Sequence, residues 1–304
     1  MDNKLALLLI GLGASLWGII GLFVTYLYEL GFTPTQVVAV RALCASICMI
    51  VYVLFKNISL LKIHLNDSKY FIGTGVFSIA LFNWCLFSAI EETSISISFI
   101  LLYTAPAFVT VLSRLLFKEL FTTRKMLALF ITFMGCSFVI GIFPVFEGSI
   151  SLYGLILGLG SGFFYALYSI FGKFALKKYD SLTVTLYTFI FSAVAILPFS
   201  KLWEIPNLFL NIESWLLIIG LGFLSTMLPF IFYTRGLQLI ESSRASIIAT
   251  IEPVVAALVG FFIFNEHLSI WQYIGIFMVI MAVVIVQESK GKRNNIVVST
   301  EIHQ

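Results

Sequence analysis

The second half of this chain repeats the first. When the sequence is shifted by 147 positions, the halves match without a gap, so that Pro106 coincides with Pro253 and Glu119 with Glu266. Small residues keep the same register in three further pairs: Gly73 with Gly220, Gly75 with Gly222, and Ser78 with Ser225. This period is too long for a solenoid. In a strongly apolar chain it predicts two fused halves, an organisation common among membrane transporters.

The composition indicates a membrane protein. Hydrophobic residues make up 60% of the 304 positions and charged residues only 11%, which leaves too few polar groups to cover a water-soluble domain. The apolar residues form ten runs of roughly 20 residues, the length of a helix that crosses about 30 Å of hydrocarbon. The sequence therefore predicts an all-α membrane protein with ten transmembrane helices. We place them at 4–28, 34–55, 69–90, 94–117, 124–143, 151–174, 181–200, 212–235, 242–264 and 268–287.

Each repeat contains five of these helices, and an odd number makes the second repeat enter the membrane from the opposite side. We therefore expect two inverted five-helix repeats at 1–146 and 147–289, followed by a polar tail at 290–304. Repeats of this kind are related by a pseudo-two-fold axis in the membrane plane and hold a site between them near the bilayer midplane. This geometry predicts transport by alternating access.

Positive charge gives the expected orientation, because Lys and Arg concentrate in cytoplasmic loops. With the N-terminus inside, all 18 lysines and arginines except Arg41 and Lys201 fall at cytoplasmic helix ends or in the tail. We therefore expect both termini in the cytoplasm and the chain in the inner or plasma membrane. The net charge of +3 follows from this topology, so we predict the lipid bilayer as a partner and no nucleic acid.

Motifs for catalysis or cofactor binding are not found. His64, His267 and His303 map to loops or the tail, and the chain has neither an HExxH helix nor a GxxxxGK[ST] loop. Cys44 and Cys48 share a helix face, but no nearby residue would complete a metal site. We therefore expect neither an enzyme, a cofactor nor a metal site, and any transport would draw its energy from gradients.

Several motifs resemble those of a known family. They are Leu16-Trp17-Gly18, Tyr103-Thr104-Ala105-Pro106 followed by Phe117-Lys118-Glu119, and Ile251-Glu252-Pro253 followed by Phe264-Asn265-Glu266. With them the chain resembles the EamA-type drug/metabolite transporter family over roughly 4–287, as two tandem units. The resemblance implies ten helices, cytoplasmic termini and movement of small metabolites such as amino acids, often outward across the bacterial inner membrane. It does not identify a substrate.

Two ionisable residues fall where the hydrocarbon interior is expected, and such residues are usually kept for function. Glu252 stands eleven residues beyond Glu241, which is roughly 16 Å at 1.5 Å per residue. Arg41 lies seven residues after Pro34, roughly 10 Å from the opposite surface. The two residues therefore share a similar depth. We expect Arg41 to meet a substrate carboxylate, and Glu252 to meet an amine or exchange a proton.

A structural alternative stays open for both residues. Arg41 would extend to the membrane surface, and a protonated Glu252 would bond the carbonyl that Pro253 leaves without a donor. Pro253, like Pro106 in the fourth helix, removes one helical hydrogen bond. Both prolines therefore predict helix kinks, and interrupted helices form the substrate sites of many transporters.

Further candidates for the substrate pathway are aromatic residues and one amide. Trp17, Tyr103, Tyr165 and Tyr168 would wall an apolar substrate body, with ordinary packing or interfacial anchoring as the alternative. Asn83 is the one amide expected at mid-depth. For Asn83 we favour a hydrogen bond to a neighbouring helix over contact with a ligand.

Glu119 and Glu266 are expected at opposite membrane faces, at the ends of the fourth and ninth helices. We favour a structural role, such as helix capping or an ion pair between Glu119 and Arg124, because charge is tolerated at exposed helix ends. Gating is the alternative. Serines open both helices and are candidate caps: Ser94, Ser96 and Ser98 in the fourth, and Ser242, Ser243 and Ser246 in the ninth.

The function we predict is a secondary transporter that moves small metabolites, amino acids or related compounds, in the export direction. The alternative is a membrane scaffold or a flippase-like lipid handler, which a cleft open sideways to lipid would mark. A stripe of small residues in the sixth helix predicts close packing: Gly154, Gly158 and Gly162. Such a stripe does not separate packing within one chain from packing in a homodimer, so a homodimer stays open.

Overall fold

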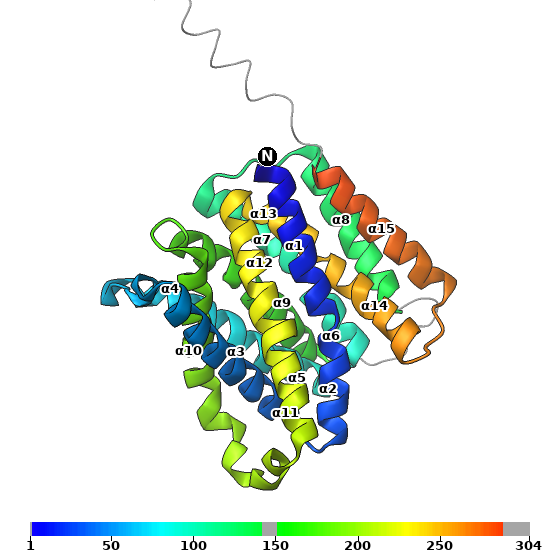
Figure 1. The fold of residues 1–304 in the computed structure, drawn as a ribbon. Helices are drawn as coiled ribbons and strands as arrows, with labels where there is room; N and C mark the ends of the chain where they lie inside the picture. Colours follow the sequence, from blue (N-terminus) through cyan, green and yellow to red (C-terminus); the bar gives the residue numbers. More distant parts are fainter. Residues whose placement is uncertain (1, 142–150, 288–304) are drawn as a thin grey trace, which may run out of the picture.

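The computed structural model describes residues 2–141 and 151–287, and every regular element in them is helical. Figure 1 shows a bundle of long helices, several of them divided into shorter pieces. The first repeat contains α1 (Asp2–Gly18), α2 (Ile20–Glu29), α3 (Pro34–Lys56), η1 (Ile58–Leu61), η2 (Leu65–Asp67), α4 (Ser68–Ile72), η3 (Gly73–Ala80), α5 (Leu81–Glu92), α6 (Ile95–Leu102), α7 (Ala105–Phe117) and α8 (Thr123–Val139). The second contains α9 (Leu152–Ala175), α10 (Ser181–Ser200), η4 (Leu202–Glu204), η5 (Pro206–Leu210), α11 (Ile212–Ile219), η6 (Gly220–Met227), α12 (Leu228–Leu239), α13 (Ser242–Ala249), α14 (Ile251–Ile263) and α15 (Ile270–Gln287).

The predicted all-α membrane fold is confirmed. Nine segments of the described residues are long and apolar enough to cross a membrane. The remaining predicted helix corresponds to α8, which has 17 residues in the described part of the chain. Its predicted last residues, 142–143, and the predicted polar tail at 290–304 lie outside the described residues.

The two described ends of the chain lie on one face of the bundle. Figure 1 shows α1 beginning, and α15 ending, at the top of the view. We call this the terminal face and the opposite one the far face. The fourth helix, α6 with α7, runs toward the terminal face, and the ninth, α13 with α14, runs away from it.

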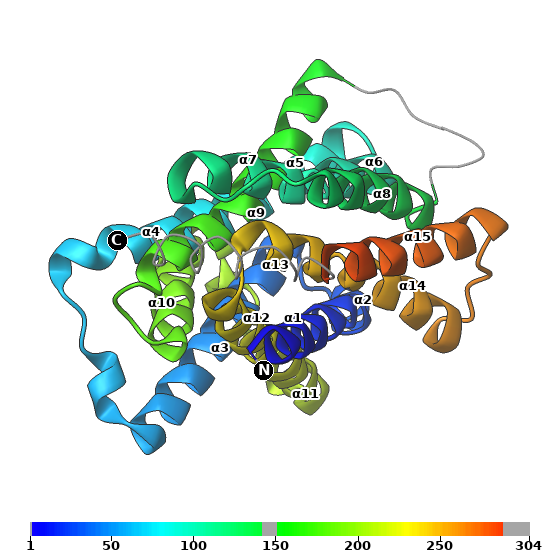
Figure 2. The same cartoon turned by 90° about the horizontal axis from the view of Figure 1, so that it is seen from above.

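Helix packing follows the repeat. In the first repeat α1 packs on α12, and its counterpart α9 packs on α5. Likewise α3 packs on η6, and its counterpart α10 packs on η3. The pairs α3 with α10 and α8 with α15 bring together counterparts of each other, and Figure 2 shows α8 beside α15 along one side of the bundle. Each repeat therefore completes its packing on the other.

The glycine pairs of the sequence repeat mark two π-helical segments. Gly73–Ala80 and Gly220–Met227 both have π geometry, and they are 147 residues apart. A Cβ on Gly75 would come within 2.6 Å of the Thr188 carbonyl oxygen on α10, and one on Gly222 within 2.5 Å of the Cys44 Cβ on α3. Only glycine permits this approach, so the repeated glycines fix how each π-helical segment crosses the other repeat.

The fourth and ninth helices are interrupted just before their prolines. Tyr103 and Thr104 separate α6 from α7, and Thr250 separates α13 from α14. Pro106 lies in the first turn of α7, where its missing N–H group costs no helical hydrogen bond. The interruptions bring irregular backbone to the middle of the bundle, a feature that the broken helices of many transporters share.

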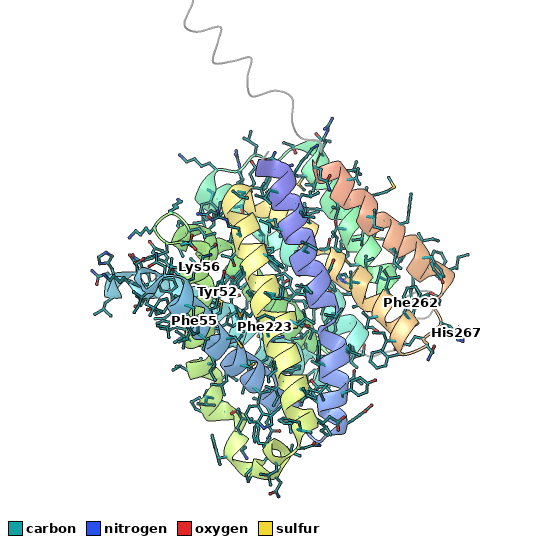
Figure 3. The ribbon with its side chains drawn as sticks, in the orientation of Figure 1. Tyr52, Phe55, Lys56, Phe223, Phe262 and His267 are labelled. Atoms are coloured by element: carbon teal, nitrogen blue, oxygen red, sulfur yellow. The ribbon has the colours of Figure 1, made fainter. Side chains whose placement is uncertain are left out.

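The outer surface carries large apolar side chains. Phe55, Phe223 and Phe262, labelled in Figure 3, have exposed fractions of 89%, 41% and 72%. Lys56 lies over the ring of Tyr52 at the end of α3, 5.5 Å from its centroid. An apolar surface ending in a tyrosine and a lysine is typical of a helix that spans lipid and reaches the interface.

Candidate functional site

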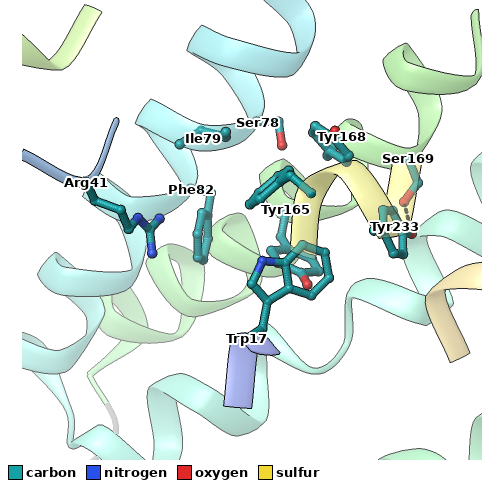
Figure 4. Close-up of a pocket in the computed structure, with 10 residues that line it drawn as sticks. Trp17, Arg41, Ser78, Ile79, Phe82, Tyr165, Tyr168, Ser169 and Tyr233 are labelled. Atoms are coloured by element: carbon teal, nitrogen blue, oxygen red, sulfur yellow. Dashed lines mark hydrogen bonds between the residues drawn. The ribbon is translucent and has the colours of Figure 1, made fainter. Parts of the chain in front are cut away.

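A small cavity of about 30 Å³ lies between the two repeats. Its lining comes from both halves of the chain: Trp17 (α1), Arg41 (α3), Ser78 and Ile79 (η3), Phe82 (α5), Tyr165, Tyr168 and Ser169 (α9), and Phe230 and Tyr233 (α12). Figure 4 shows these side chains converging from separate helices. The volume holds about one or two water molecules, so the cavity must widen before a metabolite can enter it.

Aromatic rings form one wall of the cavity. Trp17 contacts the rings of Phe230 and Tyr233, with centroids 5.0 and 5.3 Å away. Tyr168 meets Phe230 edge to face at 5.0 Å. Hydrogen bonds fix both tyrosines, because Tyr168 pairs with Thr234 and the Tyr233 hydroxyl lies 2.7 Å from the Ser169 hydroxyl. The wall is thus a fixed apolar surface with hydroxyl groups held at defined positions.

Arg41 supplies a positive charge to the opposite side of the cavity. Its guanidinium points toward the cavity in Figure 4, next to Phe82. The side chain is partly buried, and within the described residues it forms no direct ion pair or hydrogen bond. It interacts electrostatically with Glu252 and Tyr28. Even a partly buried cation without a direct partner is costly, and its donors remain free for an anionic group.

Glu252 lies beside the cavity in the first turn of α14. Its carboxylate is within hydrogen-bonding reach of Tyr165, a cavity-lining residue, and interacts with Arg41 over a longer distance. Close packing holds this turn, because a Cβ on Gly18 would lie 2.8 Å from the Glu252 carbonyl oxygen. Arg41 and Glu252 come from different repeats, so each repeat brings one ionisable side chain to the cavity or its edge.

Two further pathway candidates, Tyr103 and Asn83, do not line the cavity. Tyr103 lies at the interruption of the fourth helix and interacts electrostatically with Glu252 and Tyr165. Asn83 is buried, and its side-chain nitrogen donates to the carbonyl of Ile79, 2.7 Å away on its own helix. The expected bond from Asn83 to a neighbouring helix is therefore replaced by one to the preceding turn.

The two helix-end carboxylates have different surroundings. Glu119 is buried and binds the start of α13, while Glu266 is exposed at the end of α14. Among the described residues, the Lys125 ammonium forms an ion pair with the Glu119 carboxylate at 3.9 Å.

The family model described as the EamA-like transporter family matches residues 4–141 and 152–287. The chain belongs to this family. Its two matched regions correspond to the two repeats, so each repeat is one EamA unit. The fold, the membrane location and a role in transport follow from membership.

Similar proteins are known from an archaeon and a bacterium. An uncharacterised transporter of Archaeoglobus fulgidus is 33% identical over 211 residues, covering 68% of this chain and 74% of its own. The uncharacterised transporter YyaM of Bacillus subtilis is 27% identical over 263 residues, covering 84% and 85%. A solved crystal structure has the same fold with a TM-score of 0.78, at 14% identity over 98% of this chain and 99% of the other.

Sequence reasoning missed six of the ten cavity-lining residues of this EamA protein. Phe82, Phe230 and Tyr233 lie in mainly apolar runs, where sequence alone does not distinguish an aromatic residue at the cavity from one in the core. Ser78 carried a signal that could have found it, because it belongs to the repeated Gly-x-Gly-x-x-Ser pattern of the π-helical segments. π-Helical turns are frequent at functional sites.

Proposed function

We propose that this EamA protein is a secondary transporter that moves small zwitterionic metabolites, amino acids or related compounds, by alternating access. One observation carries the proposal: Arg41 and Glu252 flank an aromatic cavity between the repeats, each from a different repeat. In this arrangement Arg41 meets the substrate carboxylate, the aromatic wall takes the apolar body, and Glu252 meets the amine or exchanges a proton.

The orientation belongs to the same proposal. The terminal face would be cytoplasmic, because the lysines and arginines gather at the helix ends of that side. We also propose that transport runs outward across the inner or plasma membrane. We expect the protein to use a proton or substrate gradient, and no chemical reaction.

The test is a metabolite screen with protein reconstituted into liposomes at varied pH gradients. Amino acids are offered first, and counterflow of labelled substrate is the readout. Glu252→Gln should abolish the response to the pH gradient, and Arg41→Lys should weaken transport at least tenfold, because Lys cannot reproduce the planar donor geometry of Arg. Exposed residues provide matched controls: Glu213→Gln and Arg235→Lys should leave transport unchanged.

Two results would reject the proposal. One is unchanged transport in both cavity variants at normal protein levels. The other is movement of labelled lipid between leaflets without movement of any soluble metabolite, which would favour a flippase-like function.

A further inference from the structure

Two corners of the fold, one at each face, have the same backbone. Lys118 and Asn265, 147 residues apart, both adopt left-handed conformations with φ of 58° and 54°. The residue that follows each one donates its N–H to a repeat-related carbonyl: Glu119 to Ser113 at 3.3 Å, and Glu266 to Gly260 at 3.1 Å. Each corner therefore holds a glutamate in the same position relative to its helix.

At the terminal face the glutamate caps another helix. Glu119 accepts hydrogen bonds from the N–H groups of Ser242 and Ser243, at 2.8 and 3.2 Å, and from the Ser243 hydroxyl. These residues form the first turn of α13, whose preceding residue Glu241 provides no side-chain cap. Glu241 instead pairs with Lys125 at 2.9 Å. The carboxylate of Glu119 thus closes α13 against the end of α7.

At the far face the equivalent contact is open. The helix equivalent to α13 in the first repeat is α6. The first turn of α6 is capped by Ser94, whose side chain accepts a hydrogen bond from the Ile97 N–H at 3.3 Å. Ser96 occupies the position equivalent to Ser243, and the described residues show no hydrogen bond for its hydroxyl. Glu266 is exposed beside an open depression lined by Phe261 and His267.

Helix packing shows the same asymmetry. α13 packs along α7, whereas the repeat-related pair, α6 and α14, makes at most marginal contact in the described structure. Several other repeat-related contacts are matched, such as α1 with α14 and α9 with α7, while α10 packs on α12 without an equally close contact between their counterparts α3 and α5 in the described structure. The two repeats therefore differ, among other contacts, in which end of the fourth and ninth helices is closed.

We propose that Glu119 and Glu266 are alternating latches. In the conformation described here Glu119 caps α13 and the terminal face is closed. In the opposite conformation α6 moves against α14, Glu266 accepts hydrogen bonds from the first turn of α6 and the Ser96 hydroxyl, and Glu119 releases α13. The inference rests on the proposed alternating-access transport, because only such a cycle closes both faces in turn.

The sequence provides the groups for the proposed contact of Glu266 with α6, as it does for the contact of Glu119 with α13. The first N–H groups of a helix have no partner within it and attract a carboxylate, and Ser96 adds a hydroxyl where Ser243 stands in the other repeat. Gln272 occupies the position equivalent to Lys125, so the far-face latch lacks the neighbouring positive charge. This difference makes the terminal-face latch the stronger one and accounts for its being the closed one here.

The experiment measures distances across both faces of the full chain in lipid nanodiscs without substrate. Spin labels on encoded unnatural amino acids leave the four native cysteines in place. One pair, at Lys118 and Gln238, reports the terminal face, and another, at Glu91 and His267, reports the far face.

Glu119→Gln should raise the population that is open at the terminal face about tenfold, because it weakens hydrogen bonds to a charged group. Ser243→Ala, which keeps the Glu119 carboxylate, should shift the population in the same direction. It replaces Glu119→Gln if that variant folds poorly.

The decisive variant is Glu266→Gln in the Glu119→Gln background, where the far-face latch is occupied most. It should return the distance distribution toward that of the unmodified protein, and Ser96→Ala should do so more weakly. Control substitutions of carboxylates at other helix starts, Glu213→Gln and Asp180→Asn, should leave both distributions unchanged. If Glu266→Gln has no effect in this background, the latch proposal is wrong. Failure of metabolite transport with intact distance changes would instead reject the proposed function and spare the latches.

Discussion

The two repeats share a set of backbone features, which we call the frame, and differ in the charged side chains that they bring to the cavity. Both carry a π-helical segment, a helix broken at a proline and a left-handed corner at positions 147 residues apart. The charged groups at the cavity have no such counterparts. Thr188 occupies the position equivalent to Arg41, and Ala105 the position equivalent to Glu252. Symmetry is therefore kept where helices must exchange packing, and lost where a substrate would be bound.

Under the proposed alternating access, this difference has a physical reason. Alternating access needs two conformations of similar free energy, and repeated packing supplies them because each arrangement exists once in each repeat. A cavity near the midplane is used by both conformations, so its charges need to be present only once. A second Arg41 or Glu252 would add the cost of a buried charge.

The largest expected effect comes from removing a charge that only one repeat carries. Arg41→Ala should lower transport of the substrate found in the liposome screen about a hundredfold, since truncating one partner of a buried charged interaction costs 2–5 kcal/mol. The repeat-related Thr188 bonds Thr74 at 2.7 Å within the packed frame. Thr188→Ala should lower stability by about 1 kcal/mol and leave turnover per folded molecule unchanged. Equal losses of turnover in the two variants would remove the distinction between frame and site.

The next effect should be the same in both repeats. Gly75→Ala and Gly222→Ala each force a methyl group against α10 or α3, within 2.6 Å of its nearest atom. Each should lower the free energy of unfolding in mixed micelles by about 3 kcal/mol. Gly21 has no neighbour within 4 Å of its added Cβ, so Gly21→Ala is the matched control and should be neutral. A large loss for Gly75→Ala with none for Gly222→Ala would show that the frame is not symmetric in energy.

The frame could be predicted from sequence because its signals are local. Apolar run lengths place the helices, and the proline positions 106 and 253 place the interruptions of the fourth and ninth helices. The repeated glycines revealed the repeat, but neither the close approach at Gly75 and Gly222 nor the π geometry of Gly73–Ala80 and Gly220–Met227 followed from them. A shift from α to π hydrogen bonding depends on the helix packed against the segment, which the sequence does not specify.

The site was less accessible to sequence reasoning. Arg41 and Glu252 stood out because charge is rare in apolar runs, and depth counted along each helix suggested that they lie at similar levels. Phe230 and Tyr233 gave no such signal, since aromatic residues make up 16% of the chain. The partner of Glu119 was also hidden, because Ser242 and Ser243 lie 123 and 124 residues away in sequence.

The smallest expected effect tests whether the frame is symmetric at its edges. Thr33 and Asp180, 147 residues apart, are the N-caps of α3 and α10. Thr33 accepts from the Gln36 N–H at 3.4 Å, and Asp180 from the Leu182 N–H at 2.8 Å. Thr33→Ala and Asp180→Ala should each lower the free energy of unfolding by about 1 kcal/mol. Asp180→Ala should have the larger effect, because a carboxylate also interacts with the positive end of the helix. The same unfolding titration measures both, and Thr33→Ser, which keeps a hydroxyl cap, serves as the control. If either alanine variant also changes the spin-label distance across one face, the caps take part in the conformational change. The symmetric frame would then include fewer residues than the sequence repeat suggests.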